Sequence, residues 1–115
     1  MTNPINTDIK ADIGQGYISI EGTTTTVINS LITRAANKIN LITGTTTGTL
    51  QDVAIRNLAD AYAITHVMAG LGPESVNNDK FLDMRIGFIK ETKDALISGG
   101  YTPDGVTIKF ESAND

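Results

Sequence analysis

Apolar residues recur at helical spacing along three long stretches of the chain. The clearest stretch covers residues 25–42 and forms a stripe two residues wide, which is typical of a helix that packs on one face. Its apolar members are Val27, Ile28, Leu31, Ile32, Ala35, Ala36, Ile39 and Ile42, and its polar face carries Asn29, Thr33, Arg34, Asn37 and Lys38. The preceding threonines offer N-caps and Gly44 offers a C-terminal stop, so we predict a helix over 25–42.

Two further long helices are predicted over residues 50–69 and 80–98. The first of them carries apolar residues on more than one face, which indicates the more buried helix, and Gly70 is expected to end it. The second is expected to end at Gly99-Gly100. Its predicted core face consists of Phe81, Met84, Phe88, Ile89, Ala95 and Leu96.

Shorter elements separate and precede these helices. A short helix is predicted over residues 7–13, with Thr7 as its N-cap and Gly14 as its stop. Residues 17–20 are expected to form an extended or irregular connection. The threonine- and glycine-rich stretch 44–49 predicts an exposed, mobile loop, because threonine is a poor helix former and glycine is permissive.

The last stretch, residues 101–115, has a different pattern. A turn signature at 102–105 precedes a strictly alternating segment at 106–110, which is typical of a strand. The backbone N–H and C=O groups of a lone strand need partners. Two interpretations are open: the strand pairs with residues 17–20, or it is an arm that completes a sheet on another chain. The arm interpretation gives four candidate partner-interaction residues: Tyr101, Val106, Ile108 and Phe110.

Together these elements predict a mainly α protein. We expect a small antiparallel helical bundle of three long helices plus a short N-terminal helix, with a strand-like C-terminal arm. Residues 1–100 are expected to form the helical bundle domain, and residues 101–115 the extended arm. A chain of 115 residues is long enough to bury a core without disulfides or metals.

Charge disfavours direct nucleic-acid binding, although a local basic patch could still form, and composition excludes chemistry that needs cysteine. The net charge is −4 and the nine Lys and Arg residues are scattered, whereas proteins that bind phosphates usually carry a basic excess. Cysteine is absent, which removes disulfides, zinc ribbons, iron–sulfur ligation and thiol nucleophiles. We expect no signal peptide, and no apolar run approaches the roughly 20 residues that span a bilayer.

Few side chains suited to catalysis are present. His66 is the only histidine, and Asp60, six residues earlier, is expected to face away from it on the same helix. Asp8 and Asp12 have the i, i+4 spacing that offers two carboxylates to one cation, but no third ligand follows at EF-hand spacing. A structural role on the surface of the short helix is the interpretation we favour for this pair.

The charged residues of the third long helix have structural explanations. Asp79 and Asp83 suit the positive end of its dipole, and Asp79 can cap it. The pairs Lys90–Asp94 and Arg85–Lys93 are expected on its solvent side, where surface charges contribute little to stability. We therefore predict no catalytic residue, no cofactor site and no metal site.

The order of elements resembles that of the head–tail connector (adaptor) proteins of tailed bacteriophages and related viruses. In that family an early Asp-Ile-Lys helix precedes a short connection that ends in glycine. A helix of the type Leu-Ile-x-x-Ala-x-x-x-Ile then ends in Thr-Gly. The corresponding segments here are Asp8-Ile9-Lys10, Ile18-Ser19-Ile20-Glu21-Gly22, Leu31 to Ile39, and Thr43-Gly44. The resemblance spans about residues 7–98, and the threonine-rich loop departs from the family pattern.

This resemblance implies a structural virion protein and not an enzyme. It implies a homo-oligomeric ring of about twelve copies that docks on a portal protein and presents a surface to the next neck or tail-completion protein. DNA would pass through the ring without sequence-specific binding, and neither a cofactor nor a membrane is implied. The implied location is the virion neck, with assembly in the host cytoplasm.

Two other hypotheses stay open from the sequence. One is a helical protein-binding or regulatory accessory module outside a virion. The other is an enzyme that works through carboxylates alone, for which Asp8, Asp12 and His66 are the available groups.

Overall fold

The computed structural model describes residues 4–14, 25–71 and 78–102, with the backbone alone at 70–71 and 78–79. Its helices are α1 (Asn6–Ile13), α3 (Thr25–Thr43), α4 (Thr49–Leu71) and α5 (Asn78–Ser98). The part of the chain described here contains no strand, so the mainly α prediction is confirmed. The predicted extended segments at 17–20 and 106–110 lie outside the described residues.

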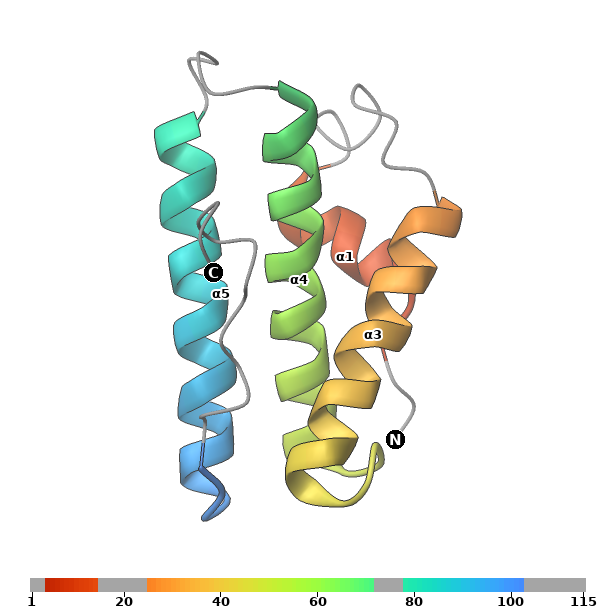
Figure 1. The fold of residues 1–115 in the computed structure, drawn as a ribbon, viewed down its shortest axis with the longest axis vertical. Helices are drawn as coiled ribbons and strands as arrows, with labels where there is room; N and C mark the ends of the chain where they lie inside the picture. The colour runs from red at the N-terminus through yellow and green to blue at the C-terminus, as the bar shows by residue number, and fades with distance from the viewer. Residues whose placement is uncertain (1–3, 15–24, 72–77, 103–115) are drawn as a thin grey trace.

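Helix α4 is the centre of the arrangement. The helices α3, α4 and α5 lie side by side with alternating direction, and α1 lies across α3 and α4 (Figure 1). Helix α4 packs against α5 on one side and against α3 on the other, and α1 contacts both α4 and α3. This confirms the predicted antiparallel bundle of three long helices and one short helix. In this row α3 and α5 are the outer helices.

Neighbours on three sides bury most of the circumference of α4. The residues that it contributes to the core are Ala54, Ile55, Leu58, Ala59, Ala61, Tyr62, Ala63, Ile64 and Val67. Four of these residues are alanines, whose small side chains let the neighbouring helices approach closely. The prediction that this helix is more buried than the one before it is confirmed.

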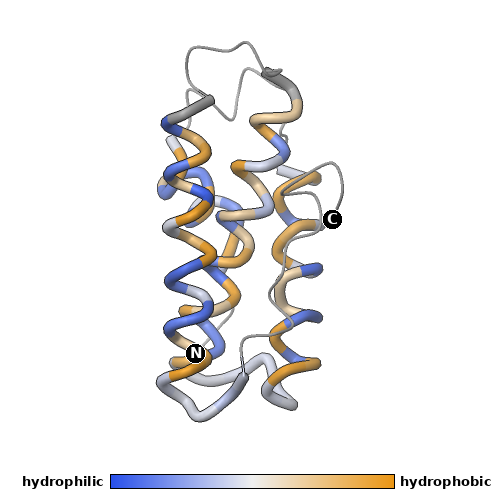
Figure 2. Tube along the Cα trace, turned by 60° about the vertical axis from the view of Figure 1, so that its left-hand side comes forward, coloured by the Kyte–Doolittle hydropathy of each residue, from blue (hydrophilic) through white to orange (hydrophobic). Residues whose placement is uncertain are grey.

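The other helices each bury one face against α4. Helix α3 contributes Ile28, Ile32, Ala35, Ala36 and Ile39, which follow helical spacing, and α1 contributes Ile9 and Ile13. In Figure 2 hydrophobic and hydrophilic positions alternate around each helix, as expected for helices that expose one side to solvent and bury the other. The predicted boundaries of the long helices agree with the observed ones to within two residues.

The face that α5 turns toward α4 differs in part from the predicted one. Its buried side chains are Phe81, Arg85, Ile89, Thr92 and Leu96, whereas Met84, Phe88 and Ala95 are only partly buried. The prediction that Arg85 lies on the solvent side with Lys93 is wrong. Arg85 is 6% exposed and its Nη1 donates to Thr65 Oγ1 at 3.4 Å, because the long alkyl stem packs among apolar groups while the guanidinium reaches a polar one.

Glycines end three of the helices through backbone conformations that other residues rarely adopt. Gly14 and Gly44 have φ values of 110° and 85°, and each donates its N–H to the carbonyl four residues earlier. At the start of α1 the prediction of Thr7 as N-cap is wrong. Ile5 holds that position, and its N–H donates to the carboxylate of Asp8 at 3.0 Å, so a side chain from inside the helix closes its first turn.

The loop between α3 and α4 is held by threonine hydroxyls. Thr43 Oγ1 donates to the carbonyl of Thr45 at 2.8 Å, and Thr45 Oγ1 accepts the N–H of Thr47 at 3.1 Å. The side chains of Thr45 and Thr47 also share a hydrogen bond of 3.1 Å. The repeated threonines of this loop therefore replace the backbone hydrogen bonds that a helix would have supplied.

Candidate functional site

The first candidate site is a group of charged side chains where α1 meets α4. Arg56 of α4 donates from Nε to Asp12 Oδ2 at 2.8 Å and from Nη2 to Asp12 Oδ1 at 2.7 Å. Asp8 lies one turn earlier on α1, with its Oδ1 3.9 Å from Arg56 Nη1. Asp60, one turn after Arg56, is 1% exposed and shares a hydrogen bond with Asp12. We call these four residues the Arg56 cluster.

The environment of the Arg56 cluster divides its acids into two kinds. Burial, followed by the hydrogen bond and the charge of Asp12, raises the pKa of Asp60 to about 10. Asp60 is therefore a neutral acid at pH 7, and its O–H donates to Asp12. Burial alone would raise the pKa of Asp12, but hydrogen bonds from Arg56 and Asp60 and the Arg56 charge outweigh it and hold this pKa below its ordinary value.

The contacts of the Arg56 cluster attach α1 to α4. Asp8 and Asp12, which the sequence offered as a carboxylate pair for one cation, both face a guanidinium instead. In the described ranges no group of three or more His, Cys, Asp or Glu side chains is arranged to hold a metal ion. The structural interpretation of the two aspartates is thus the one that the contacts support.

His66 has no carboxylate partner at hydrogen-bond distance among the described residues. It lies exposed on α4, whereas Asp60 is buried on another face of the same helix, as the six-residue spacing predicts. Of the other predicted acids, Asp83 is exposed and the side chain of Asp79 lies outside the described atoms. These residues give no grounds for an acid–base pair.

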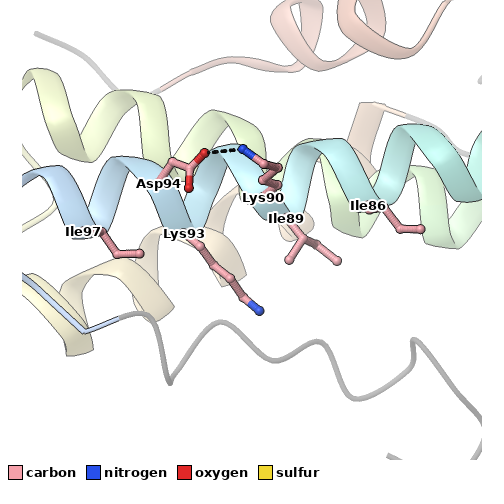
Figure 3. A pocket seen from close by; sticks show the side chains of 6 residues that line it. All are labelled: Ile86, Ile89, Lys90, Lys93, Asp94 and Ile97. Atoms are coloured by element: carbon pink, nitrogen blue, oxygen red, sulfur yellow. Dashed lines mark hydrogen bonds and ion pairs between the residues drawn. The ribbon is translucent and has the colours of Figure 1, made fainter.

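The second candidate site is a groove along α5. It is lined by Ile86, Ile89, Lys90, Lys93, Asp94 and Ile97, and we call this set the α5 groove. Ile86 and Ile97 are 52% and 57% exposed, values that are high for isoleucine. Figure 3 shows Ile86, Lys93 and Ile97 projecting from one side of the helix, while Lys90 pairs with Asp94 at 2.8 Å.

A second hollow lies where the start of α4 meets the end of α5. Its lining residues are Thr49, Leu50, Val53, Glu91, Asp94, Ala95 and Ser98. Val53, which lines this hollow, is 44% exposed. Because two carboxylates flank an apolar floor, this hollow suits a partner with basic and apolar groups.

The predicted partner-interaction residues lie at and beyond the end of α5. Tyr101 is half-buried and packs against the core of the bundle. Its N–H donates to the carbonyl of Leu96 at 2.9 Å, and Gly100, at φ 85°, donates to the carbonyl of Ile97 at 3.0 Å. This pair of bonds is a Schellman cap, in which the residue after the glycine commonly packs against the last turn. Val106, Ile108 and Phe110 lie outside the described residues.

Sequence reasoning missed the exposed apolar side of α5, although a signal was present. Leu82, Ile86 and Ile97 fall about 60°, 100° and 120° of rotation from the centre of the buried row, on a helix whose core face was already complete. It also missed the burial of Asp60. That acid stands among alanines and apolar residues, and this surrounding sequence was the available signal.

Comparison with known proteins gives no identification. No family model, no curated protein and no solved structure matches the chain. Among residues 4–14, 25–71 and 78–102, no helix has the length and apolar content that crossing a bilayer requires. The class that the fold and sites define is therefore a small helical bundle with exposed apolar surfaces on its outer helices.

Proposed function

We propose that this chain is a structural virion protein, a head–tail connector (adaptor) whose copies form a ring between portal and tail. The observation that carries the proposal is the exposure of large apolar side chains on both outer helices of the row. Leu41 on α3 is 79% exposed, and Ile86 and Ile97 on α5 are each more than half exposed. Exposed apolar side chains that gather on a surface mark contacts with other proteins. They gather on α5, where Leu82, Ile86 and Ile97 are exposed, whereas α3 contributes Leu41.

A ring requires two different surfaces on each protomer, because every copy meets one neighbour with each of its two sides. The outer helices α3 and α5 provide such a pair of surfaces on opposite sides of α4 (Figure 1). The resemblance in the order of elements supports the same proposal independently. The proposed partners are further copies of the chain, a portal protein and the next neck or tail-completion protein.

The charge of the chain fits a channel through which DNA moves. A net charge of −4 disfavours attachment of the phosphate backbone to the ring. DNA would therefore pass without sequence-specific binding. The proposed location is the virion neck, reached after assembly in the host cytoplasm, and no cofactor takes part.

The proposal is tested by assembly with a portal ring. The purified chain, alone and mixed with the portal protein encoded in the same genome, is examined by analytical ultracentrifugation and electron microscopy. We expect rings, or stoichiometric attachment to the portal ring. A chain that stays monomeric and ignores the portal would contradict the proposal. A tight complex with a soluble partner outside any virion would instead favour the helical binding module.

A matched pair of variants links that result to the proposed surface. Leu41→Asp places a charge where the outer face of α3 would meet a neighbour, and we expect it to abolish ring formation. Thr33→Asp adds the same charge at an exposed position on the polar side of α3 and should leave assembly intact. Equal assembly of both variants would remove α3 from the proposed contact.

A further inference from the structure

The α5 groove is an open hollow along one side of α5. Ile86, Ile89 and Ile97 form its apolar floor, on a side of α5 that adjoins the buried row. We propose that the α5 groove binds the chain's own C-terminal segment, residues 103–110, laid back along the helix. This inference concerns the isolated chain and does not rest on the proposed function; on assembly into a ring, a neighbouring copy would replace the segment on Ile86 and Ile97.

The end of α5 places the segment beside the groove. Ile97 lines the groove only four residues before Tyr101, and the cap at Gly100 turns the backbone out of the helical path. With φ at 85°, Gly100 lets the Tyr101 N–H bond back to Leu96, so the chain no longer continues along the helix axis. The residues that follow are thus released at one end of the α5 groove.

Length and spacing suit this occupant. From Ile97 to Ile86 the groove follows eleven residues of helix, which is about 16 Å at 1.5 Å per residue. Eight residues in extended form reach roughly 26 Å, so the segment covers that length even if Pro103-Asp104-Gly105 forms a turn. Val106, Ile108 and Phe110 alternate in the sequence, so they share one side of an extended segment and can face the three isoleucines.

Charge is complementary as well. In the groove Lys90 is paired with Asp94, whereas the amine of Lys93 points away from that pair (Figure 3). Residues 103–115 carry Asp104, Glu111 and Asp115 against a single Lys109. Residues 103–110 alone are neutral, with Asp104 against Lys109, so the negative charge that complements Lys93 comes from Glu111 and Asp115 after the segment.

Tryptophan fluorescence tests the proposal, because the chain contains no tryptophan of its own. Phe110→Trp in the full-length chain introduces a single reporter within the segment. We expect its emission to be shifted to the blue, as for an indole in apolar surroundings, and the shift to be the same at all protein concentrations at which the chain is monomeric. Emission typical of a fully solvated indole would overturn the proposal. A shift that disappears on dilution would also overturn it, because the segment would then bind a second copy.

Groove variants complete the test. Ile86→Asp and Ile97→Asp, each added to Phe110→Trp, should return the emission to that of a solvated indole. Both positions are more than half exposed, so the helical content by circular dichroism should stay unchanged. Leu41→Asp is the matched control on α3 and should leave the emission shifted to the blue. A blue shift that survives both groove substitutions would place the segment elsewhere and overturn the proposal.

Discussion

Arg56 of α4 binds Asp12 of α1 through two hydrogen bonds of 2.8 and 2.7 Å, although 44 residues separate them in the chain. The paired, planar geometry is one that arginine makes with a carboxylate and lysine does not. Together with Ile9 and Ile13, which are buried, this pair fixes how α1 lies across α4. The short helix has only eight residues and would not be stable on its own.

Replacing Arg56 should therefore weaken the attachment of α1. For Arg56→Met we expect a loss of about 1–2 kcal/mol in the free energy of unfolding, because the bidentate pair is only partly shielded from water. Urea denaturation followed by circular dichroism measures this loss. The control is Lys90→Met, which breaks an ion pair in full contact with solvent and should leave the midpoint unchanged. Equal losses of unfolding free energy in the two variants would contradict the role of the Arg56 cluster in attaching α1.

The raised pKa of Asp60 predicts how stability depends on pH. The folded chain keeps the Asp60 proton up to a pKa of about 10, whereas the unfolded chain loses it near 3.8. Between these values the folded state binds more protons, so stability falls as pH rises, by at most about 1.4 kcal/mol per pH unit. Asp12 acts in the opposite direction but only at acid pH, because its folded pKa lies below its ordinary value.

Asp60→Asn should remove this dependence. The asparagine amide donates to Asp12 as the protonated acid does, but it does not titrate. We expect the variant to gain stability over the parent chain, and the gain to grow from pH 5 to pH 9, as measured by urea denaturation at each pH. Parallel pH profiles for the two proteins would show that Asp60 is ionised in the folded chain.

Two glycines of the α5 region should respond to alanine in opposite directions. Gly100 has φ at 85°, so Gly100→Ala forces a side chain into the left-handed region and should cost about 1–2 kcal/mol. Gly87 lies in the exposed middle of α5, where an added Cβ meets no atom within 4 Å. Gly87→Ala should stabilise the chain by up to about 1 kcal/mol through helix propensity. Thermal unfolding measures the stability change of each variant. Changes of the same sign in both variants would contradict the helix end described for α5.

Two apolar residues on the last turns of α3 provide a test of the core. Ile39 is fully buried, so Ile39→Ala should cost about 2–5 kcal/mol by removing apolar contacts and leaving a cavity. Leu41, two residues later, is 79% exposed, and Leu41→Ala should change stability by less than about 0.5 kcal/mol. Denaturation at low protein concentration, where association is absent, makes the comparison direct.

Periodicity predicted the helices well because each outer helix buries one continuous stripe. The stripe of α3 and the wide burial of α4 follow from the spacing of their isoleucines and alanines. Rotation of α5 was predicted less well, because its sequence offers two apolar sides and only the packing partner selects between them. Because Arg85 is buried on the selected side, counting apolar residues did not identify that side as the packed one.

The candidate sites show the same limit. Spacing placed Asp8 and Asp12 on one side of a helix, which is correct, but it did not identify Arg56 as the group they face. That contact joins segments far apart in the chain, and a single sequence contains no signal for such a pairing. That His66 and Asp60 face different sides of α4 was predictable, because both residues lie on one helix and the angle between them follows from its geometry.

In the described part of the chain, α4 contacts each of the other helices, α1, α3 and α5. The core of the described residues is therefore shared between α4 and all of its neighbours. A cut in the loop between Gly44 and Gly48 would separate α1 and α3 from α4 and α5 and leave the isoleucines of α3 without α4 to pack against. We expect two such fragments to be unstructured apart and to regain helical structure when mixed, so that folding becomes an association reaction.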